Sequence, residues 1–239
     1  FQQTNAIEKE LPSIIKKYLD NKNNKEKAYN DLLKMLNELI KLQADTVKLM
    51  LSERSFEGRR GALYSKALLI LKFIELYFNK NLQIKEGIYD RRITAEHILS
   101  QKVDLEAKNI TLESLGFKDE MEKNAYIHRI GNLTLLTNTE NASLGNALFS
   151  EKKSTYALSN YVVCSTLVKP LETAVKNGKD TEFCKMINQY EKQYSSANGE
   201  WGKFEIDKRS KDIANLIYDI LLKKFKEEVK KINNIFIRQ

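Results

Sequence analysis

Two stretches interrupt an otherwise helical pattern and so set the fold class: residues 90–100, DRRITAEHILS, and residues 130–137, IGNLTLLT. The first combines a charged lead-in with β-branched residues and has no helical period, which predicts a short strand that ends near His97. The second is another β-rich run, and Gly131 and Asn132 at its start indicate a tight turn. The sequence therefore predicts two short strands, separated by a segment that contains a loop and a helix.

Helical patterns flank these strands on both sides. Residues 25–53 and 62–79 place apolar side chains at helical spacing. After the second strand the sequence predicts one helix that begins near Thr139–Asn141 and runs through ASLGNALFSEKKSTYAL. Only two prolines and nine glycines interrupt the 239 residues, which favours helices over an all-β fold. We therefore expect a mainly α protein with an embedded strand–loop–strand–helix motif. Its expected domains are a helical bundle or linker over residues 1–85 and a second domain over residues 86–239.

The chain is basic, with 40 lysine and arginine residues, 32 aspartate and glutamate residues, a formal net charge of +8 and a pI near 9.2. Such a balance favours polyanionic partners, nucleic acid first and an acidic membrane surface second. The competing interpretation is that the lysines only solvate helix faces. The charge is thus compatible with a nucleic-acid-binding protein without requiring one.

Several features predict a cytoplasmic protein. No run of about 18 apolar residues is present, so we expect no transmembrane helix. The N-terminus lacks the basic and apolar segments of a signal peptide, and because it also lacks an initiator Met we expect a piece of a longer chain. Cys164 and Cys184 have no Cys or His close by in the sequence, which favours reduced thiols over a zinc pair or a disulfide.

Histidine chemistry is confined to His97 and His128, because the chain has no other histidine. Glu96 directly precedes His97, and at the end of a strand both side chains can reach one ligand. A neutral imidazole can act as a general base toward water. His128 falls at the end of a predicted helix, where we expect a capping or packing role rather than catalysis.

An asparagine-rich stretch supplies the second half of the predicted site. It contains four asparagines and is followed by two lysines: Asn132, Asn138, Asn141, Asn146, Lys152 and Lys153. Amide and carboxylate oxygens are ligands that Mg²⁺ or Mn²⁺ prefers, and such an ion neutralises charge on a scissile phosphate. Lysines hold the flanking phosphates. This combination suits phosphodiester hydrolysis, although Asn138 as a helix cap and Asn146 as a turn residue have purely structural interpretations as well.

Three stretches together resemble a known nuclease family. AEHILSQ over residues 95–101, IGNLTLL over residues 130–136 and TENASLGNALFSEKKSTY over residues 139–156 are similar to the HNH (ββα-metal, His-Me finger) endonucleases. More narrowly, they resemble the C-terminal nuclease domain of GmrSD-type restriction enzymes and related phage-defence proteins. The family often has proline where Ser100 stands, and proline would stiffen that loop. The resemblance makes residues 86–239 an HNH-like nuclease domain.

The resemblance also implies roles for individual residues. His97 would be the general base, and Glu96 would bind a divalent metal, most simply Mg²⁺, directly or through water. Asn132 would serve catalysis by holding the loop through backbone hydrogen bonds, and Asn141 would complete the metal site. Asn146 and Lys153 match family positions of less certain role.

Further basic and polar residues are expected to contact nucleic acid. These are Arg91, Arg92, Arg129, Asn146, Lys152, Lys153 and Arg209. Arg91 and Arg92 have the alternative of being solvated residues before a strand. Arg209, within a pattern Trp201, Ile206 and Arg209 that resembles the family's tail, is open to packing or DNA contact.

The hypothesis that follows is a divalent-metal-dependent DNA endonuclease of restriction or anti-phage defence. One alternative is a nucleic-acid-binding module with a decayed site, and another is a helical module that docks an upstream NTPase. The resemblance implies such an NTPase or sensor domain in the same longer chain. No membrane partner is expected, and a homo-oligomer is left open.

Overall fold

The computed structural model describes residues 16, 34, 38, 41, 44–58, 61–78, 92–168 and 199–237. Contacts within the chain divide it into one unit of residues 1–49 and 218–239 and another of residues 50–217, here called the core unit. The described residues of the predicted site all fall within the core unit. In the first unit, the Lys48 ammonium lies 4.5 Å from the ring centre of Tyr218.

Two short antiparallel strands, β1 (Ile93–His97) and β2 (Leu133–Thr137), form the sheet of the core unit. Their register pairs Ile93 with Thr137, Glu96 with Thr134 and His97 with Leu133. The backbone N–H of Asn138 continues the pairing by donating to the carbonyl of Arg92 (2.7 Å). Both predicted strands are confirmed, and β1 ends at His97 as the sequence predicts.

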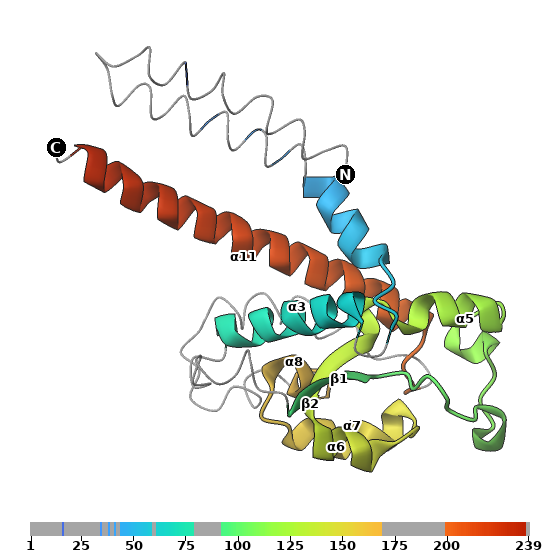
Figure 1. The fold of residues 1–239 in the computed structure, drawn as a ribbon. Helices are drawn as coiled ribbons and strands as arrows, with labels where there is room; N and C mark the ends of the chain where they lie inside the picture. The colour runs from blue at the N-terminus through green and yellow to red at the C-terminus, as the bar shows by residue number, and fades with distance from the viewer. Residues whose placement is uncertain are drawn as a thin grey trace. The chain divides into compact units, whose positions relative to one another are not determined.

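Helices enclose this sheet (Figure 1). Helix α3 (Ala62–Phe78) contacts both strands and the short helix α8 (Val162–Ser165), and α6 (Asn138–Leu144) also contacts both strands. On α3 the Tyr64 hydroxyl accepts a hydrogen bond from the Ala95 backbone N–H (3.0 Å). The mainly α fold class is therefore confirmed. The predicted domain boundary at residue 85 falls between α3 and the two strands on which α3 packs.

The residues after β2 form two helices instead of the single predicted one. Helix α6 ends at Leu144, and α7 (Phe149–Leu158) begins after a break at Gly145, whose φ of 54° favours glycine. A capping box starts α6, because the Thr137 hydroxyl accepts from the Glu140 N–H (3.2 Å) while the Glu140 carboxylate accepts from the Thr137 N–H (2.8 Å). The break turns the chain so that α6 and α7 carry different parts of the site.

Helices α5 (Glu120–Ile127) and α11 (Lys203–Ile237) complete the described elements, with short 3-10 turns at Glu106–Lys108, Glu113–Leu115 and Ile130–Asn132. The last turn passes so close to α11 that a Cβ atom on Gly131 would lie 2.1 Å from the Ile206 carbonyl oxygen. The Gly131 N–H donates to the Ser210 hydroxyl of α11 (3.0 Å). Glycine is therefore required at this contact.

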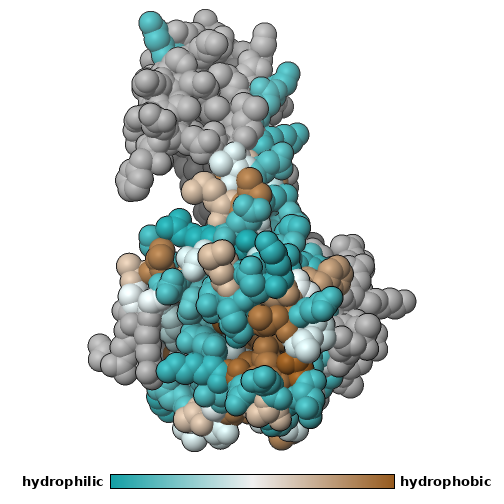
Figure 2. Space-filling model, turned by 90° about the vertical axis from the view of Figure 1, so that its right-hand side faces the viewer, coloured by the Kyte–Doolittle hydropathy of each residue, from teal (hydrophilic) through white to brown (hydrophobic). Residues whose placement is uncertain are grey.

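The surface view in Figure 2 shows mainly hydrophilic side chains around a smaller hydrophobic area. Within the described ranges, no helix has the length and apolar character needed to cross a membrane. Cys164 is buried as a free thiol, and burial raises its pKa to about 12. Cys184 lies outside the described residues.

Candidate active site

A cavity of about 870 Å³ opens beside the end of β1. It brings together residues from the loop before α3, the end of β1, the end of α5 and the start of α6. Its polar lining includes Glu57, His97, Gln101, His128, Asn141 and Asn146. His97 and Asn141 lie far apart in sequence, and both line this cavity. The predicted metal-dependent chemistry requires these two residues in one site.

The two histidines of the chain are in direct contact in this cavity. His97 Nε2 lies 3.1 Å from His128 Nδ1, and the rings meet edge to face with an interplanar angle of 83°. The amide nitrogen of Gln101 lies 3.0 Å from the same Nε2 atom. His128, for which a cap or packing role was predicted, is indeed the C-cap residue of α5 but also touches the candidate base.

Burial favours the neutral form of both imidazoles. Burial, together with the electrostatic effects of His128 and Lys152, lowers the pKa of His97 to about 3. Burial also lowers the pKa of His128, and the Glu57 carboxylate acts in the opposite direction. A neutral His97 carries a nitrogen lone pair, which is what a general base requires.

Asn132 holds the backbone around both histidines. Its side chain is completely buried; Oδ1 accepts from the Leu99 N–H (2.8 Å), and Nδ2 donates to the carbonyls of Leu99 (3.0 Å) and Ile127 (2.8 Å). Leu99 follows His97 by two residues and Ile127 directly precedes His128. The backbone hydrogen bonds expected of Asn132 are therefore present, while its part in catalysis stays a prediction.

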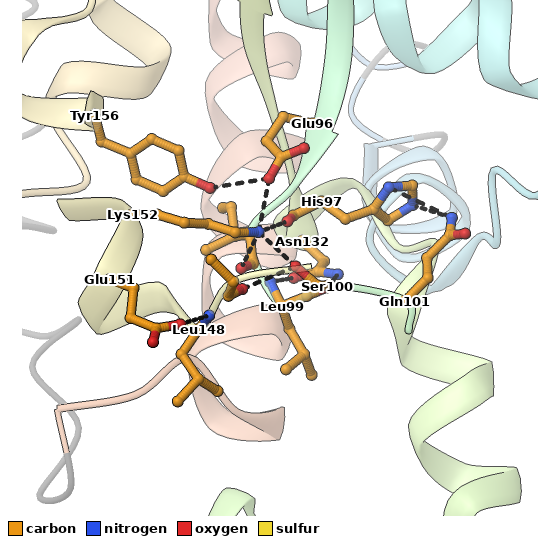
Figure 3. A network of polar contacts seen from close by, with 12 residues as sticks. Glu96, His97, Leu99, Ser100, Gln101, Asn132, Leu148, Glu151, Lys152 and Tyr156 are labelled. Atoms are coloured by element: carbon orange, nitrogen blue, oxygen red, sulfur yellow. Dashed lines mark hydrogen bonds and ion pairs between the residues drawn. The ribbon is translucent and has the colours of Figure 1, made fainter. Parts of the chain in front are cut away.

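Lys152 and Glu96 form a buried ion pair on the other side of β1 (Figure 3). The Lys152 ammonium lies 2.7 Å from Glu96 Oε1, 2.7 Å from the His97 carbonyl and 3.2 Å from the Ile98 carbonyl. Tyr156 Oη lies 3.5 Å from the same carboxylate oxygen. Burial raises the pKa of Glu96 and lowers that of Lys152, and in each case the charge of the partner opposes the shift.

These contacts bear on the roles predicted for Lys152 and Glu96. The Lys152 side chain is 0% exposed, so the prediction that it contacts phosphate is wrong. Glu96 also lines the cavity, and its Oε1 atom is paired with the Lys152 ammonium; its role as a metal ligand stays a prediction. In Figure 3 its carboxylate points to Lys152 and Tyr156, whereas the His97 ring points toward Gln101.

Ser100 contributes to the same network, at the position where the resembling family often has proline. Its hydroxyl lies 2.6 Å from the Lys152 ammonium and donates to the Ala147 carbonyl (2.9 Å). The serine thereby connects the loop after β1 to the segment between α6 and α7. These hydrogen bonds restrain the loop after β1, as a proline ring would at this position in the resembling family.

Helix α6 presents asparagines to the cavity. Asn138 and Asn141 lie three residues apart, so they share one helix face, and both line the cavity. Asn146 lines it from the segment after Gly145. Among the described residues, no group of three His, Cys, Asp or Glu side chains is placed to hold a metal ion. Any ion here would therefore depend partly on amide oxygens.

The predicted nucleic-acid contacts divide by exposure. Arg92, Asn146 and Lys153 are exposed, and the Lys153 ammonium lies 5.1 Å from the ring centre of Phe149. Arg129 is half-buried, with an ion pair to Asp207 (3.1 Å) and a cation–π contact to Tyr126. Arg91 lies outside the described residues.

Arg209 is buried, and the predicted contact with nucleic acid is wrong for this residue. Its guanidinium donates to the carbonyls of Gly131 (2.8 Å), Leu133 (2.7 Å) and Val163 (3.3 Å). Of the two roles left open by the sequence, packing is the one observed. Arg209 fixes α11 to the residues on both sides of Asn132.

Among the cavity residues that sequence reasoning missed, Glu57, Gln101 and His128 lie beside the candidate base or add charge near it. For His128 the signal was available, because a chain with only two histidines has few ways to assemble an imidazole pair. Glu57 and Gln101 gave no such signal, since each is one of many similar polar residues. Their placement depends on tertiary contacts.

A family model described as GmrSD restriction endonucleases, C-terminal domain, matches residues 43–216. No curated protein and no solved structure matches the chain. The matched range covers more than half of the sequence and includes every residue of the cavity. A nuclease function of the restriction-endonuclease type accompanies this family. The chain therefore belongs to the family of GmrSD restriction endonuclease C-terminal domains.

Proposed function

We propose that this chain is a divalent-metal-dependent DNA endonuclease of the HNH type in which His97 is the general base. The observation that carries the proposal is the position of His97: a neutral imidazole at the end of β1, open to a large polar cavity that Asn141 also lines. A base of this kind must be unprotonated and accessible to water. Family membership supplies the reaction class, and the cavity supplies the candidate residues.

The cavity residues fit a hard divalent cation such as Mg²⁺. Such an ion binds to one or a few protein oxygens and keeps water or phosphate oxygens as its other ligands. Asn141 would hold it through its amide oxygen, and the nearby Glu57 carboxylate adds negative charge to the same cavity. When bound, the ion would neutralise charge that develops on the phosphate and on the leaving oxygen.

In the proposed reaction, His97 removes a proton from a water molecule. The water oxygen forms a bond to phosphorus while the bond between phosphorus and the departing sugar oxygen breaks, and that oxygen gains a proton from solvent. His97 then returns its proton to solvent. A general base contributes about 10²- to 10⁴-fold to such a rate.

The surroundings keep His97 in place during this step. Lys152 binds the His97 carbonyl, and Asn132 binds Leu99 two residues later. Exposed cations, Arg92 and Lys153 among them, would hold the DNA backbone, in keeping with the net charge of +8. The chain thus separates residues that support the base from residues that would contact substrate.

Cleavage of supercoiled plasmid tests the proposal, with Mg²⁺ or Mn²⁺ added to metal-free protein. His97→Ala should lose about 10²- to 10⁴-fold in rate. Asn141→Ala should require a higher metal concentration. Met121→Ala, on a side chain that is 79% exposed on α5, serves as the matched control and should cleave normally. Cleavage by His97→Ala at the wild-type rate would refute the assigned base.

DNA binding without cleavage under any divalent metal would instead support the alternative of a binding module with a decayed site. Nicking can be distinguished from double-strand cutting in the same assay by the appearance of open-circular or linear plasmid. A cytoplasmic location, an upstream NTPase partner and a homo-oligomer stay predictions.

A further inference from the structure

We propose that His128 is a positioning residue for the base: it accepts a hydrogen bond from the Nε2–H of His97 and so keeps the His97 Nδ1 lone pair free to take a proton from water. This inference rests on the proposed function, because it states which ring nitrogen of the proposed base carries a proton and which one accepts a proton from water. It concerns a residue whose predicted role was limited to the end of a helix.

The two imidazole rings are in direct hydrogen-bond contact. His97 Nε2 and His128 Nδ1 lie 3.1 Å apart, a hydrogen-bond distance that requires one proton between the two nitrogens. A neutral imidazole carries one N–H and one lone pair. If His97 supplies the shared proton, its Nδ1 is a base. If His128 supplies it, His97 carries its own proton on Nδ1 and cannot accept one from water there.

Gln101 competes with His128 for the Nε2 atom of His97. Its amide nitrogen lies 3.0 Å from His97 Nε2 and 3.4 Å from Nδ1, and a donor at Nε2 favours the unproductive tautomer. The Gln101 side chain is exposed, and a half-turn of its amide presents oxygen in place of nitrogen. Gln101 can therefore adapt to either tautomer, and the more firmly held group decides between them.

His128 is firmly held. Its carbonyl accepts from the Phe56 N–H (2.9 Å), and Ser55 and Arg129 form an antiparallel bridge beside it. On its other side, Asn132 Nδ2 donates to the Ile127 carbonyl (2.8 Å). Because Asn132 also binds Leu99, one buried side chain connects the backbone near both histidines.

The His97 ring becomes positively charged during the proposed reaction. When Nδ1 of His97 takes the water proton, the ring becomes an imidazolium, and its Nε2–H now makes a charge-assisted hydrogen bond to His128. The Glu57 carboxylate lines the same cavity, and its negative charge acts to raise the pKa of His128. Burial disfavours the protonated form of His97, and the hydrogen bond to His128 offsets part of that cost as the proton is transferred.

The test is a long-range ¹H–¹⁵N correlation spectrum of ¹⁵N-histidine-labelled protein near pH 7.5. Only two imidazoles contribute signals, and His128→Asn identifies those of His97. The expected result is a His97 ring protonated at Nε2 and unprotonated at Nδ1. A His97 ring protonated at Nδ1 in the wild-type protein would overturn the proposal.

Two variants of His128 separate positioning from folding. His128→Asn places an amide oxygen near the position of Nδ1, so it should preserve the His97 tautomer and keep cleavage within about tenfold of wild type. His128→Leu removes the acceptor, so the Nδ1–H form should appear and cleavage should fall by at least about 10²-fold. A wild-type tautomer in His128→Leu would refute the role of His128, and so would loss of the tautomer in His128→Asn.

Gln101→Ala provides the matched comparison on the other contact of Nε2. It should leave the His97 tautomer unchanged, and a change would show that Gln101, and not His128, sets it. Failure of the proposed function gives a different result from failure of this inference. Wild-type protein with the expected tautomer but without cleavage under any metal would refute the nuclease proposal while supporting the role of His128 in orienting the ring.

Discussion

The ammonium group of Lys152 donates a hydrogen bond to the backbone carbonyl of His97, with 2.7 Å between the two atoms. The same ammonium contacts Glu96, the residue that precedes the candidate base. Helix α7 thus reaches under the end of β1 and restrains the two residues at which the strand stops. A buried charge in this position supports the active site without facing the substrate.

Lys152→Met should destabilise the protein by about 3–5 kcal/mol, because it leaves the Glu96 carboxylate buried without its ammonium partner. Urea denaturation measures the effect. The adjacent Lys153→Met should change stability by less than about 0.5 kcal/mol, because Lys153 is exposed. The double variant Glu96→Gln with Lys152→Met should lose less than the sum of the single losses. Strict additivity would show that the ion pair is not the cause.

Asn132→Ala should lower both stability and cleavage. It removes the partners of the Leu99 N–H and of the carbonyls of Leu99 and Ile127, and each buried group left unsatisfied costs about 1–3 kcal/mol. Thermal unfolding and plasmid cleavage are the measurements. Asn124→Ala, on an exposed position of α5, is the control. Equal melting temperatures for the two variants would contradict the role assigned to Asn132.

Stability should fall in acid because of His97. Its pKa is about 3 in the folded protein and near 6.5 when unfolded, so between these values the unfolded chain binds a proton that the folded chain does not. The stability is fully present above pH 6.5 and is lost as pH falls toward 3, with a slope of at most about 1.4 kcal/mol per pH unit from this group. Denaturation across this range should show a shallower slope in His97→Gln, and identical slopes would contradict the prediction.

Lys153→Ala should weaken DNA binding without altering stability. One lost phosphate contact reduces the slope of log affinity against log salt by about 0.9. Fluorescence anisotropy at several salt concentrations measures that slope on a non-cleavable duplex. Leu158→Ala, an exposed apolar residue on the same helix, should leave the slope unchanged. An unaltered slope in Lys153→Ala would remove this residue from the DNA-binding surface.

The sequence predicted those parts of the fold that depend on neighbouring residues. The strand ending at His97 and the strand through Leu133–Thr137 were predicted from β-branched composition and turn residues. The break between α6 and α7 was not, because the stretch around Gly145 is otherwise compatible with a helix. The positive φ of Gly145 ends α6, and α7 then begins separately at Phe149.

The site was less predictable, because burial distinguishes residues that look alike in sequence. Lys152 and Lys153 are adjacent and chemically identical, yet one is enclosed under β1 and the other is exposed. Arg209 likewise became a structural residue when α11 packed against Gly131. The contact between His97 and His128 depends on the end of α5 lying beside the end of β1, which no local pattern specifies.

The pairing of Glu96 with Thr134 and of His97 with Leu133 has a consequence for evolution by insertion and deletion. Neighbouring strand residues face opposite ways, so a slip of one position would exchange acid and imidazole between their compartments. The carboxylate would then lose its Lys152 partner, and the imidazole would lose its contacts with His128 and Gln101. We expect natural length variation to avoid these five-residue strands and to accumulate in the loops outside them.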